Sequence, residues 1–265
     1  MKESNIYHNF MALVDPKKLQ NKVKEMYKAV AQNPHGKFHF EMGRSLAIKL
    51  GYPEADLDKI PNASIESFAG VGYHFDMADI KSGEAVLDLG SGSGMDAFIA
   101  VLKTGREGKV VGLDMTDEQL SKAEKLKNKA GFSNVMFKKG YIEKLPEKEG
   151  KFDVVISNGV INLSAKKEKV FQEIARVLKK GGRMAISDII TEKQLTDDIV
   201  CDINIWASCI GGAAQGDTYK QYIQNAGLVI KKVRTNSQYS FLSESAQGAT
   251  KDFGVKSISL IAVKK

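Results

Sequence analysis

The chain has 265 residues, 43% of them hydrophobic, and it contains two cysteines. This length allows one large domain, or one domain with an appendage, and it can bury a sizeable core without covalent cross-links. Two cysteines are too few for a disulfide framework or a four-thiolate zinc site, and no apolar run approaches the ~18–20 residues of a membrane span. Without a secretory signal either, we expect a globular, cytoplasmic protein. The net charge of +7 indicates either an anionic partner or a lysine-coated surface.

The first 80 residues are dominated by polar segments with helical character. A helix is predicted over roughly residues 15–31, followed by a turn near 33–36 and a second helix over roughly 41–50. The stretch 53–72 contains two prolines and few periodic apolar residues, so we expect loop or lid rather than core there. Residues 1–80 are therefore predicted to form an N-terminal helical cap and lid on the domain formed by residues 81–265.

From residue 81 onward, short apolar runs alternate with segments of helical period. The runs are 85–89, 110–113, 135–137, 152–157, 183–187, 228–233 and 257–263. Such alternation indicates βαβ units, and hence an α/β fold with a parallel sheet and helices on both faces. The glycine pair at 181–182 is expected to end the helix before the fifth run. No clear crossover helix separates the last two runs, because residues 236–254 are polar and ambiguous, so an antiparallel final pair is plausible.

A glycine-rich loop follows the first run, with Gly90, Gly92 and Gly94 at alternate positions after Asp88. Glycines at the end of a buried strand let the backbone approach a nucleotide-like ligand, although some such loops only make a turn. The dinucleotide fingerprint needs its third glycine one place later, where this chain has Met95. A carboxylate at Asp88 would repel a diphosphate and attract an ammonium group. The loop therefore favours a cofactor with a cationic amino-acid end.

The second run ends in Asp114, followed by Met115. A carboxylate at this place can accept both hydroxyl groups of a ribose, and Met115 could lie against an adenine ring. The alternative is that Asp114 only caps the helix that begins near residues 116–118. A further loop at 140–146 follows the third run and is expected at the same edge of the sheet.

Taken together, these motifs resemble class I S-adenosylmethionine-dependent methyltransferases. The segments that carry the resemblance are 88–94, 114–115, 140–146 and 152–158. More narrowly, segments 157–164, 184–188 and 207–213 are similar to the arsenite methyltransferase branch. The resemblance covers roughly residues 20–235. It implies a Rossmann-like sheet of seven strands with the last strand antiparallel, and S-adenosylmethionine as the cofactor.

The resemblance also implies roles for individual residues. Asp88 and the glycines Gly90, Gly92 and Gly94 would hold the methionine part of the cofactor, and Asp114 would bind the ribose. The adenine would be surrounded by Met115, Tyr141, Ile142 and Glu143. Asn158 would face the methyl group, and Tyr27, on the N-terminal helix, would close over the cofactor.

The sequence departs from the arsenite branch in its cysteines. That branch binds trivalent arsenic through converging thiolates, because sulfur is the ligand such a centre prefers. The resemblance implies one thiol in the loop before strand one, one directly after the Ser-Asn of strand four, and one in a Cys-x-Gly-Gly element. Here residues 67–73 contain no cysteine and Gly159 stands after strand four, so only Cys209 matches. If the segment is helical, Cys201 lies ~12 Å from Cys209 along the axis, too far to share an arsenic atom.

We therefore expect a small, organic methyl acceptor, with arsenite as the alternative. Gly159 is expected to enlarge the acceptor pocket, which a segment around residues 190–226 would cover. Trp206 lies three residues before Cys209, so on a helix both could face the acceptor. The plainer interpretations are that Cys209 is a small buried residue and that Trp206 fills the core. No metal site is predicted, and no catalytic base is assigned among the candidates Asp188, Glu143 and His74.

Other functions are less well supported by the residues. A nucleic-acid methyltransferase is disfavoured because strand four lacks an Asn/Asp-Pro-Pro-aromatic element and the lysines occur as scattered pairs rather than in a stripe. We expect neither a nucleic-acid partner nor a membrane. An NAD(P)-dependent oxidoreductase is disfavoured by Asp88 and Met95, while a protein that binds the cofactor without turnover remains open. The sequence does not indicate the oligomeric state.

Overall fold

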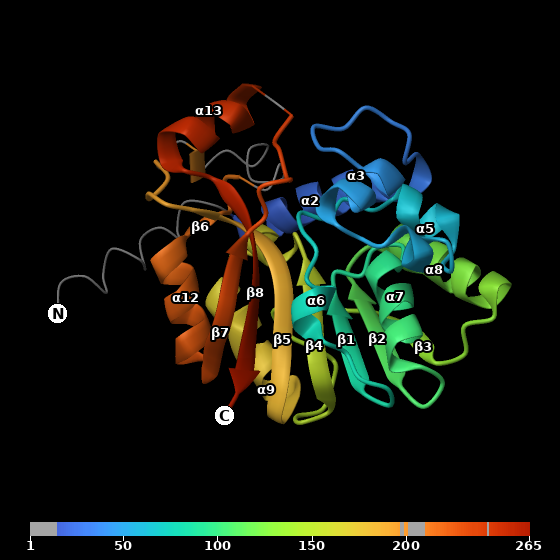
Figure 1. Ribbon diagram of the computed structural model, residues 1–265. Coiled ribbons are helices and arrows are strands. Elements are labelled where there is room, and N and C mark those ends of the chain that lie inside the picture. Colours follow the sequence, from blue (N-terminus) through green and yellow to red (C-terminus); the bar gives the residue numbers. More distant parts are fainter. Residues whose placement is uncertain (1–14, 197–198, 201–209, 243) are drawn as a thin grey trace.

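The computed structural model describes residues 15–196, 199–200, 210–242 and 244–265. One sheet forms the centre of the molecule, with the strand order β3-β2-β1-β4-β5-β8-β7 and a short β6 beside β5 (Figure 1). The strands are β1 (Ala85–Leu89), β2 (Lys109–Asp114), β3 (Val135–Lys139), β4 (Phe152–Asn158), β5 (Leu178–Thr191), β6 (Ala214–Gln215), β7 (Leu228–Thr235) and β8 (Lys256–Lys264). Only β8 runs antiparallel to its neighbours. The predicted α/β fold with an antiparallel last strand is confirmed, and the two-residue β6 is added to the seven expected strands.

The two faces of the sheet carry different helices. Helices α6 (Phe75–Ala78), α7 (Met95–Thr104) and α8 (Asp117–Ala130) belong to one side, and α9 (Lys167–Val177) and α12 (Gly216–Asn225) to the other. Successive side chains of β1 alternate between them: Val86 packs in one cluster with Phe98 of α7, and Leu87 packs in the other with Phe171 of α9. The sheet is therefore covered on both faces, as parallel sheets require.

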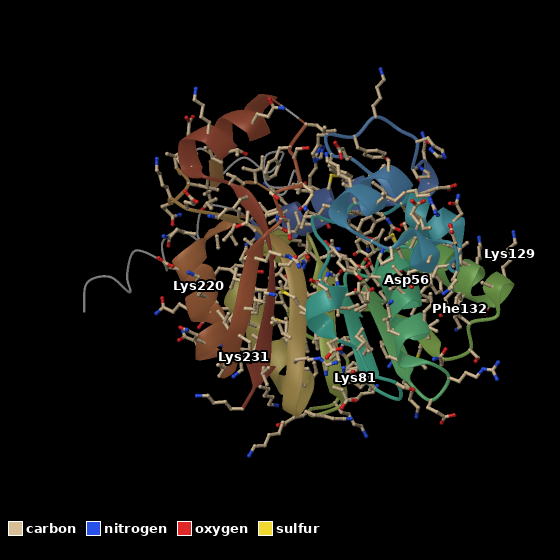
Figure 2. All side chains as sticks on the ribbon, viewed as in Figure 1. Asp56, Lys81, Lys129, Phe132, Lys220 and Lys231 are labelled. Atoms are coloured by element: carbon tan, nitrogen blue, oxygen red, sulfur yellow. The ribbon has the colours of Figure 1, made fainter. Side chains whose placement is uncertain are left out.

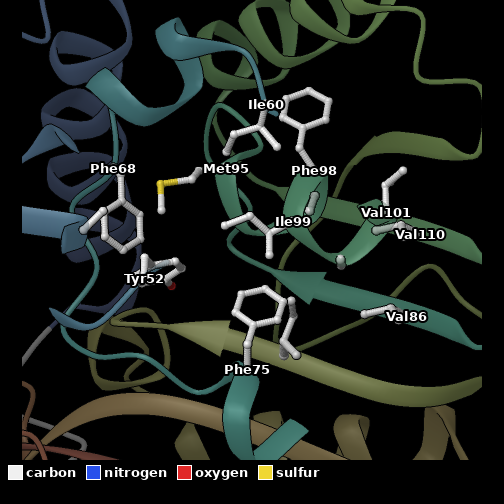
Figure 3. Close-up of a cluster of buried hydrophobic side chains, with 14 of the residues drawn as sticks. Tyr52, Ile60, Phe68, Phe75, Val86, Met95, Phe98, Ile99, Val101 and Val110 are labelled. Carbon is white, nitrogen blue, oxygen red and sulfur yellow. The ribbon is translucent and has the colours of Figure 1, made fainter. Parts of the chain in front are cut away.

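The N-terminal helices lie over the carboxyl ends of the parallel strands (Figure 1). They are α2 (Pro16–Gln32), α3 (Gly43–Leu50), α4 (Glu54–Leu57) and α5 (Asn62–Glu66). The prediction of loop rather than core for residues 53–72 is wrong, because this stretch forms α4 and α5. Its residues Leu57 and Ile65 are buried with Met95 in the cluster shown in Figure 3. Helices of four or five residues are too short to show a period, so the sequence pattern did not reveal them.

The cap, lid and domain boundaries remain predictions, although the described part of residues 1–80 shares one buried cluster with the sheet. That cluster brings Tyr52 and Phe68 of the N-terminal part to the Met95 end of α7 (Figure 3). The predicted acceptor-covering segment around 190–226 is described only in part, since residues 197–198 and 201–209 lie outside the described residues.

The C-terminal half corrects one local expectation and confirms another. Helix α9 ends at Val177 and β5 begins at once at Leu178, so the glycine pair at 181–182 lies inside the strand rather than at the end of the helix. Gly181 has φ +76, and the register between β4 and β5 shifts nearby, which accounts for glycine at this place. The ambiguous segment forms α13 (Glu244–Phe253), and the plausible antiparallel pair is present as β7 and β8.

Exposed lysines are spread over the surface of the described residues. Lys81, Lys129, Lys220 and Lys231 are all exposed, and they lie at separate places around the molecule (Figure 2). This distribution agrees with a lysine-coated surface, while the absence of a nucleic-acid partner stays a prediction. Across the described helices, none combines the length and apolar character needed to cross a bilayer.

Candidate cofactor site and active site

A cavity lies at the carboxyl ends of β1, β2 and β4. In the sheet β1 lies between β2 and β4, so the strands that follow β1 are added first on one side of it and then on the other. Such a reversal of strand order is the usual ligand site of open α/β sheets. All but one of the predicted cofactor residues line this cavity. They are Tyr27, Asp88, Gly90, Gly92, Asp114, Met115, Tyr141, Ile142, Glu143 and Asn158. The fold thus brings together residues from five separate segments of the chain.

Gly94 is the exception, because it is not among the cavity-lining residues. It is the N-cap of α7 with φ +95, and a Cβ there would lie 2.7 Å from the Phe137 ring. Glycine is therefore required at this place by the turn and by close packing. Spacing alone could not separate this structural glycine from the two that line the cavity.

Asp114 connects the end of β2 to the glycine loop. Its Oδ2 accepts a hydrogen bond from the Gly92 amide at 2.9 Å, and its Oδ1 accepts one from the Thr116 amide at 2.8 Å. Burial raises the pKa of Asp114 above its usual value, against these hydrogen bonds. Thr116, not Asp114, is the N-cap residue of α8. Since each carboxylate oxygen can accept more than one bond, Asp114 can fix the loop and still bind a ligand hydroxyl.

Asp88 contributes to the cavity a carboxyl oxygen without a hydrogen-bond donor in the described part of the chain. Its side chain is almost completely buried, and among the described residues no donor reaches its Oδ2 or the Oγ of Ser91. Burial, together with Asp96 and Asp114, raises the pKa of Asp88 well above its usual value. No lysine, arginine or histidine occurs among the described lining residues. Because buried polar atoms are normally paired, this wall fits a ligand that carries an ammonium group, as the amino-acid end of S-adenosylmethionine does.

A hydrogen-bonded group beside Asp88 was not predicted from the sequence. The Tyr52 hydroxyl donates to Asp96 Oδ1 at 2.8 Å, and the Asn158 amide donates to Asp96 Oδ2 at 3.2 Å and to the Tyr52 oxygen at 3.0 Å. Burial raises the pKa of Asp96 to about 6, although both hydrogen bonds oppose this. Asn158 lines the cavity as predicted, but its side chain is held by the protein itself.

Helix α2 is attached to the cavity through Gln119 of α8. The Gln119 amide donates to the Tyr27 carbonyl oxygen at 2.9 Å, and the Ser93 hydroxyl donates to Gln119 Oε1 at 2.5 Å. The Tyr27 ring is stacked on Phe40 with a centroid separation of 6.3 Å. Gln119 therefore links the glycine loop to the helix that carries Tyr27, and nothing in its sequence context marked it.

The three candidate bases lie in different surroundings. Glu143 lines the cavity and accepts a hydrogen bond from Ser164 at 2.5 Å. Asp188 is buried outside the cavity lining and accepts from Tyr219 at 2.5 Å, and burial raises its pKa to about 6. His74 is also buried outside it, and burial lowers its pKa to about 3. Only Glu143 faces the cavity, so the structure gives no reason to assign a catalytic base elsewhere.

The predicted substrate residues are only partly described. Trp206 and Cys209 lie outside the described residues. Gly159 is not among the described residues that line this cavity, and its effect on an acceptor pocket stays a prediction. Its φ is +71, and a Cβ there would lie 3.2 Å from Val71 Cγ1, so the space beside Gly159 is already filled.

Comparison with known proteins agrees with this geometry. Residues 80–227, more than half of the chain, match the family described as "Methyltransferase domain". The chain belongs to this family. Its strand order, glycine loop and cavity are those of a class I S-adenosylmethionine-dependent methyltransferase.

Within that class, the chain is similar to arsenite methyltransferases. It is 32% identical to the arsenite methyltransferase of Halobacterium salinarum over 85% of this chain and 61% of that protein. Identity to the human arsenite methyltransferase is 46%, over 48% of this chain and 36% of the human protein. The crystal structure of an arsenic(III) S-adenosylmethionine methyltransferase from Chlamydomonas reinhardtii superposes with a TM-score of 0.67 and 29% identity, covering 80% of this chain and 73% of that one. The matched region spans less than two thirds of the Halobacterium salinarum and human proteins.

Proposed function

We propose that this protein transfers a methyl group from S-adenosylmethionine to a small organic molecule. The observation that carries the proposal is the buried Asp88 carboxylate in a cavity whose described ionisable side chains are all acidic. When bound, S-adenosylmethionine supplies an electrophilic methyl group on a positively charged sulfur. Carboxylates in a site of low water content attract such a cation more strongly than they would in solvent.

We assign each part of the cofactor to residues of this cavity. Asp88 and the backbone of Gly90 and Gly92 would hold the amino-acid end, and Asp114 would accept hydrogen bonds from the ribose. The adenine ring would lie among Met115, Tyr141, Ile142 and Glu143, with Tyr27 above. What the protein contributes to the reaction is alignment of the reactants and exclusion of water.

The acidic residues of the cavity wall, Asp88 and Asp96, also restrict the charge of the methyl acceptor. Asp96 and Asp88 lie at the same end of the cavity as Asn158, the residue that the resemblance puts near the methyl group. A carboxylate or phosphate there would meet two buried acidic groups with no cation among the described lining residues. We therefore infer that the acceptor carries no anionic group beside this wall, and that the atom that receives the methyl group is uncharged and has a free lone pair.

Arsenite is the second candidate acceptor, because the curated relatives named above are arsenite methyltransferases. Against it stands the apolar contact between Val71 and Gly159, in the two segments where the resemblance implies thiols. A site of several thiolates cannot be built there, since neither residue carries sulfur. Cys209 alone offers one ligand to a centre that prefers several.

Radiolabelled S-adenosylmethionine would test both acceptors. The purified protein is incubated with a metabolite extract or with arsenite, and transfer of label is followed for the wild type, Cys209→Ser and the control Cys201→Ser. We expect label in organic products for all three proteins. Efficient arsenite methylation that Cys209→Ser abolishes and Cys201→Ser does not would overturn the organic acceptor. Absence of calorimetric binding of S-adenosylmethionine would overturn the whole proposal.

A further inference from the structure

A chain of hydrogen bonds runs from helix α7 to the segment that precedes α6. It starts at Asp96, whose carboxylate accepts from Tyr52 at 2.8 Å and from the Asn158 amide at 3.2 Å. Asn158 continues it to the backbone: its Oδ1 accepts from the Val71 amide at 2.8 Å, and its Nδ2 donates to the Gly72 carbonyl oxygen at 3.0 Å. One side chain at the end of β4 therefore binds two consecutive residues of a segment almost ninety positions earlier.

The direction of every bond in this chain is fixed by what each group can donate. The Val71 amide can only donate, so it requires the Asn158 oxygen on its side. The Asn158 NH₂ group then has to point toward Asp96. An ionised carboxylate only accepts, and it therefore suits this orientation. A neutral amide or a protonated acid at position 96 would weaken that preference, because only the Val71 amide and the Gly72 carbonyl would then hold Asn158 against a flip.

We propose that Asp96 is a positioning residue that acts through Asn158. Its carboxylate holds the Asn158 amide in the one orientation that binds Val71 and Gly72, and so fixes the 70–72 segment beside the cavity. Gly70 and Asn158 both line the cavity, so the shape of this wall depends on Asp96. The inference rests on the proposed function only where it treats the cavity as the cofactor site. The hydrogen bonds themselves join protein atoms alone.

The ionisable groups around Asp96 make its effect on the orientation of Asn158 sensitive to pH. Asp88 lies nearby on β1, Tyr52 and Tyr73 face Asp96 from the N-terminal part, and His74 Nε2 is 3.9 Å from Asp96 Oδ2. Burial keeps His74 neutral above its pKa of about 3, so it supplies no compensating charge near neutral pH. Burial also raises the pKa of Asp96 to about 6. We therefore expect Asp96 to orient Asn158 at neutral pH and to lose this effect in mildly acidic solution.

Hydrogen–deuterium exchange of the Val71 amide, resolved by NMR, tests the inference without any cofactor. In Asp96→Asn we expect the protection of this amide to fall about two- to tenfold, the effect expected when its hydrogen bond to the neutral Asn158 amide is weakened or lost. Tyr52→Phe removes the Tyr52 bonds to Asp96 and from Asn158 but leaves the bond from Asn158 to Asp96, so it should have a smaller effect.

The Ala85 amide offers a matched control, since it donates to the Asp153 carboxylate at 2.9 Å. Asp153→Asn should reduce protection at Ala85 and leave Val71 unchanged. Unchanged protection at Val71 in Asp96→Asn would overturn the inference, as would an equal loss at Val71 and Ala85, which indicates general destabilisation.

The exchange rate of the Val71 amide divided by that of the Ala85 amide, measured at several pH values, shows how protection of Val71 depends on pH. The pH dependence of intrinsic amide exchange cancels in this ratio. Burial acts on Asp153 as well, but hydrogen bonds from Lys179 and Ala85 outweigh it and lower the Asp153 pKa. In the wild type the ratio should change around pH 6, and in Asp96→Asn it should stay flat. A wild-type ratio that is constant from pH 5 to pH 8 would contradict the role of the Asp96 charge.

Discussion

Val71 Cγ1 lies 3.2 Å from the position that a Cβ on Gly159 would occupy. These two residues come from the segment before β1 and from the turn after β4, so distant parts of the chain meet in an apolar contact. They are also the two segments in which the resemblance to arsenite methyltransferases implies thiols. The contact leaves glycine as the residue that fits at position 159, for both its backbone conformation and its packing.

Gly159→Ala should lower the free energy of unfolding by about 1–3 kcal/mol. One part is the left-handed backbone, at about 1–2 kcal/mol for a residue with a Cβ, and the other is overpacking against Val71. Gly150→Ala isolates the first part, because Gly150 has φ +59 and no atom within 4 Å of an added Cβ. Denaturant unfolding of both variants, and of Gly159→Ala combined with Val71→Ala, separates the two. Equal losses in Gly159→Ala and Gly150→Ala would mean that Val71 does not restrict this site.

Asp114→Ala should weaken binding of S-adenosylmethionine by about 10- to 100-fold, because a hydrogen bond to a charged group contributes roughly 1.5–3 kcal/mol. The Gly92 amide also loses its acceptor in this variant. Asp117→Ala is the control: Asp117 is exposed at the start of α8, three residues after Asp114, and its ion pair with Lys139 lies on the surface. Isothermal titration calorimetry measures the affinity of both variants for S-adenosylmethionine. An affinity equal to that of Asp117→Ala would exclude Asp114 from the ribose site.

Sequence reasoning succeeded where one segment carries its own pattern. Seven of the strands were predicted because each is a short apolar run bounded by turns. Most residues predicted to bind the cofactor line one cavity because they follow strand ends, where parallel strands share an edge. Asp88 and Asp114 illustrate this, since both line the cavity.

The rest depended on contacts between distant segments. Tyr52 and Gln119 bind cavity residues through hydrogen bonds that span 44 and 92 positions, and neither lies in a motif. Gly94 and Gly159 looked like ligand-facing glycines, yet both are set by packing against Phe137 and Val71. Which neighbour fills the space beside a glycine is decided by the tertiary structure, and a single sequence does not contain that information in local form.

His74 should make the protein less stable in acid. Its pKa is lowered by burial to about 3 in the folded state, from 6.5, so the unfolded chain binds more protons between these values. The contribution of neutral His74 to the free energy of unfolding is complete above pH 6.5, and it is lost as the pH falls toward 3. Asp96 and Asp188, whose pKa values are raised to about 6 by burial, act in the opposite direction, so the wild-type curve alone is ambiguous.

The difference between the wild type and His74→Phe isolates the histidine. Between pH 7.5 and pH 5, the wild type should lose about 2 kcal/mol more than the variant, from the separation of the two pKa values. Urea unfolding at both values of pH gives this difference. Parallel losses in the two proteins would show that His74 is not kept neutral by burial.

Tyr219→Phe should lower the free energy of unfolding by about 1–3 kcal/mol near pH 8. The Tyr219 hydroxyl donates to Asp188 Oδ2 at 2.5 Å, while its ring packs edge-on against Phe171 and keeps that contact in the variant. Burial raises the pKa of Asp188 to about 6, and the bond from Tyr219 counteracts this. The loss should therefore shrink near pH 4.5, where Asp188 is protonated and no longer a buried charge. Tyr141→Phe, which removes a hydroxyl from a side chain that is 41% exposed, should change stability little at either pH. A loss in Tyr219→Phe that is the same at pH 4.5 and pH 8 would mean that the hydroxyl does not act by stabilising the Asp188 carboxylate.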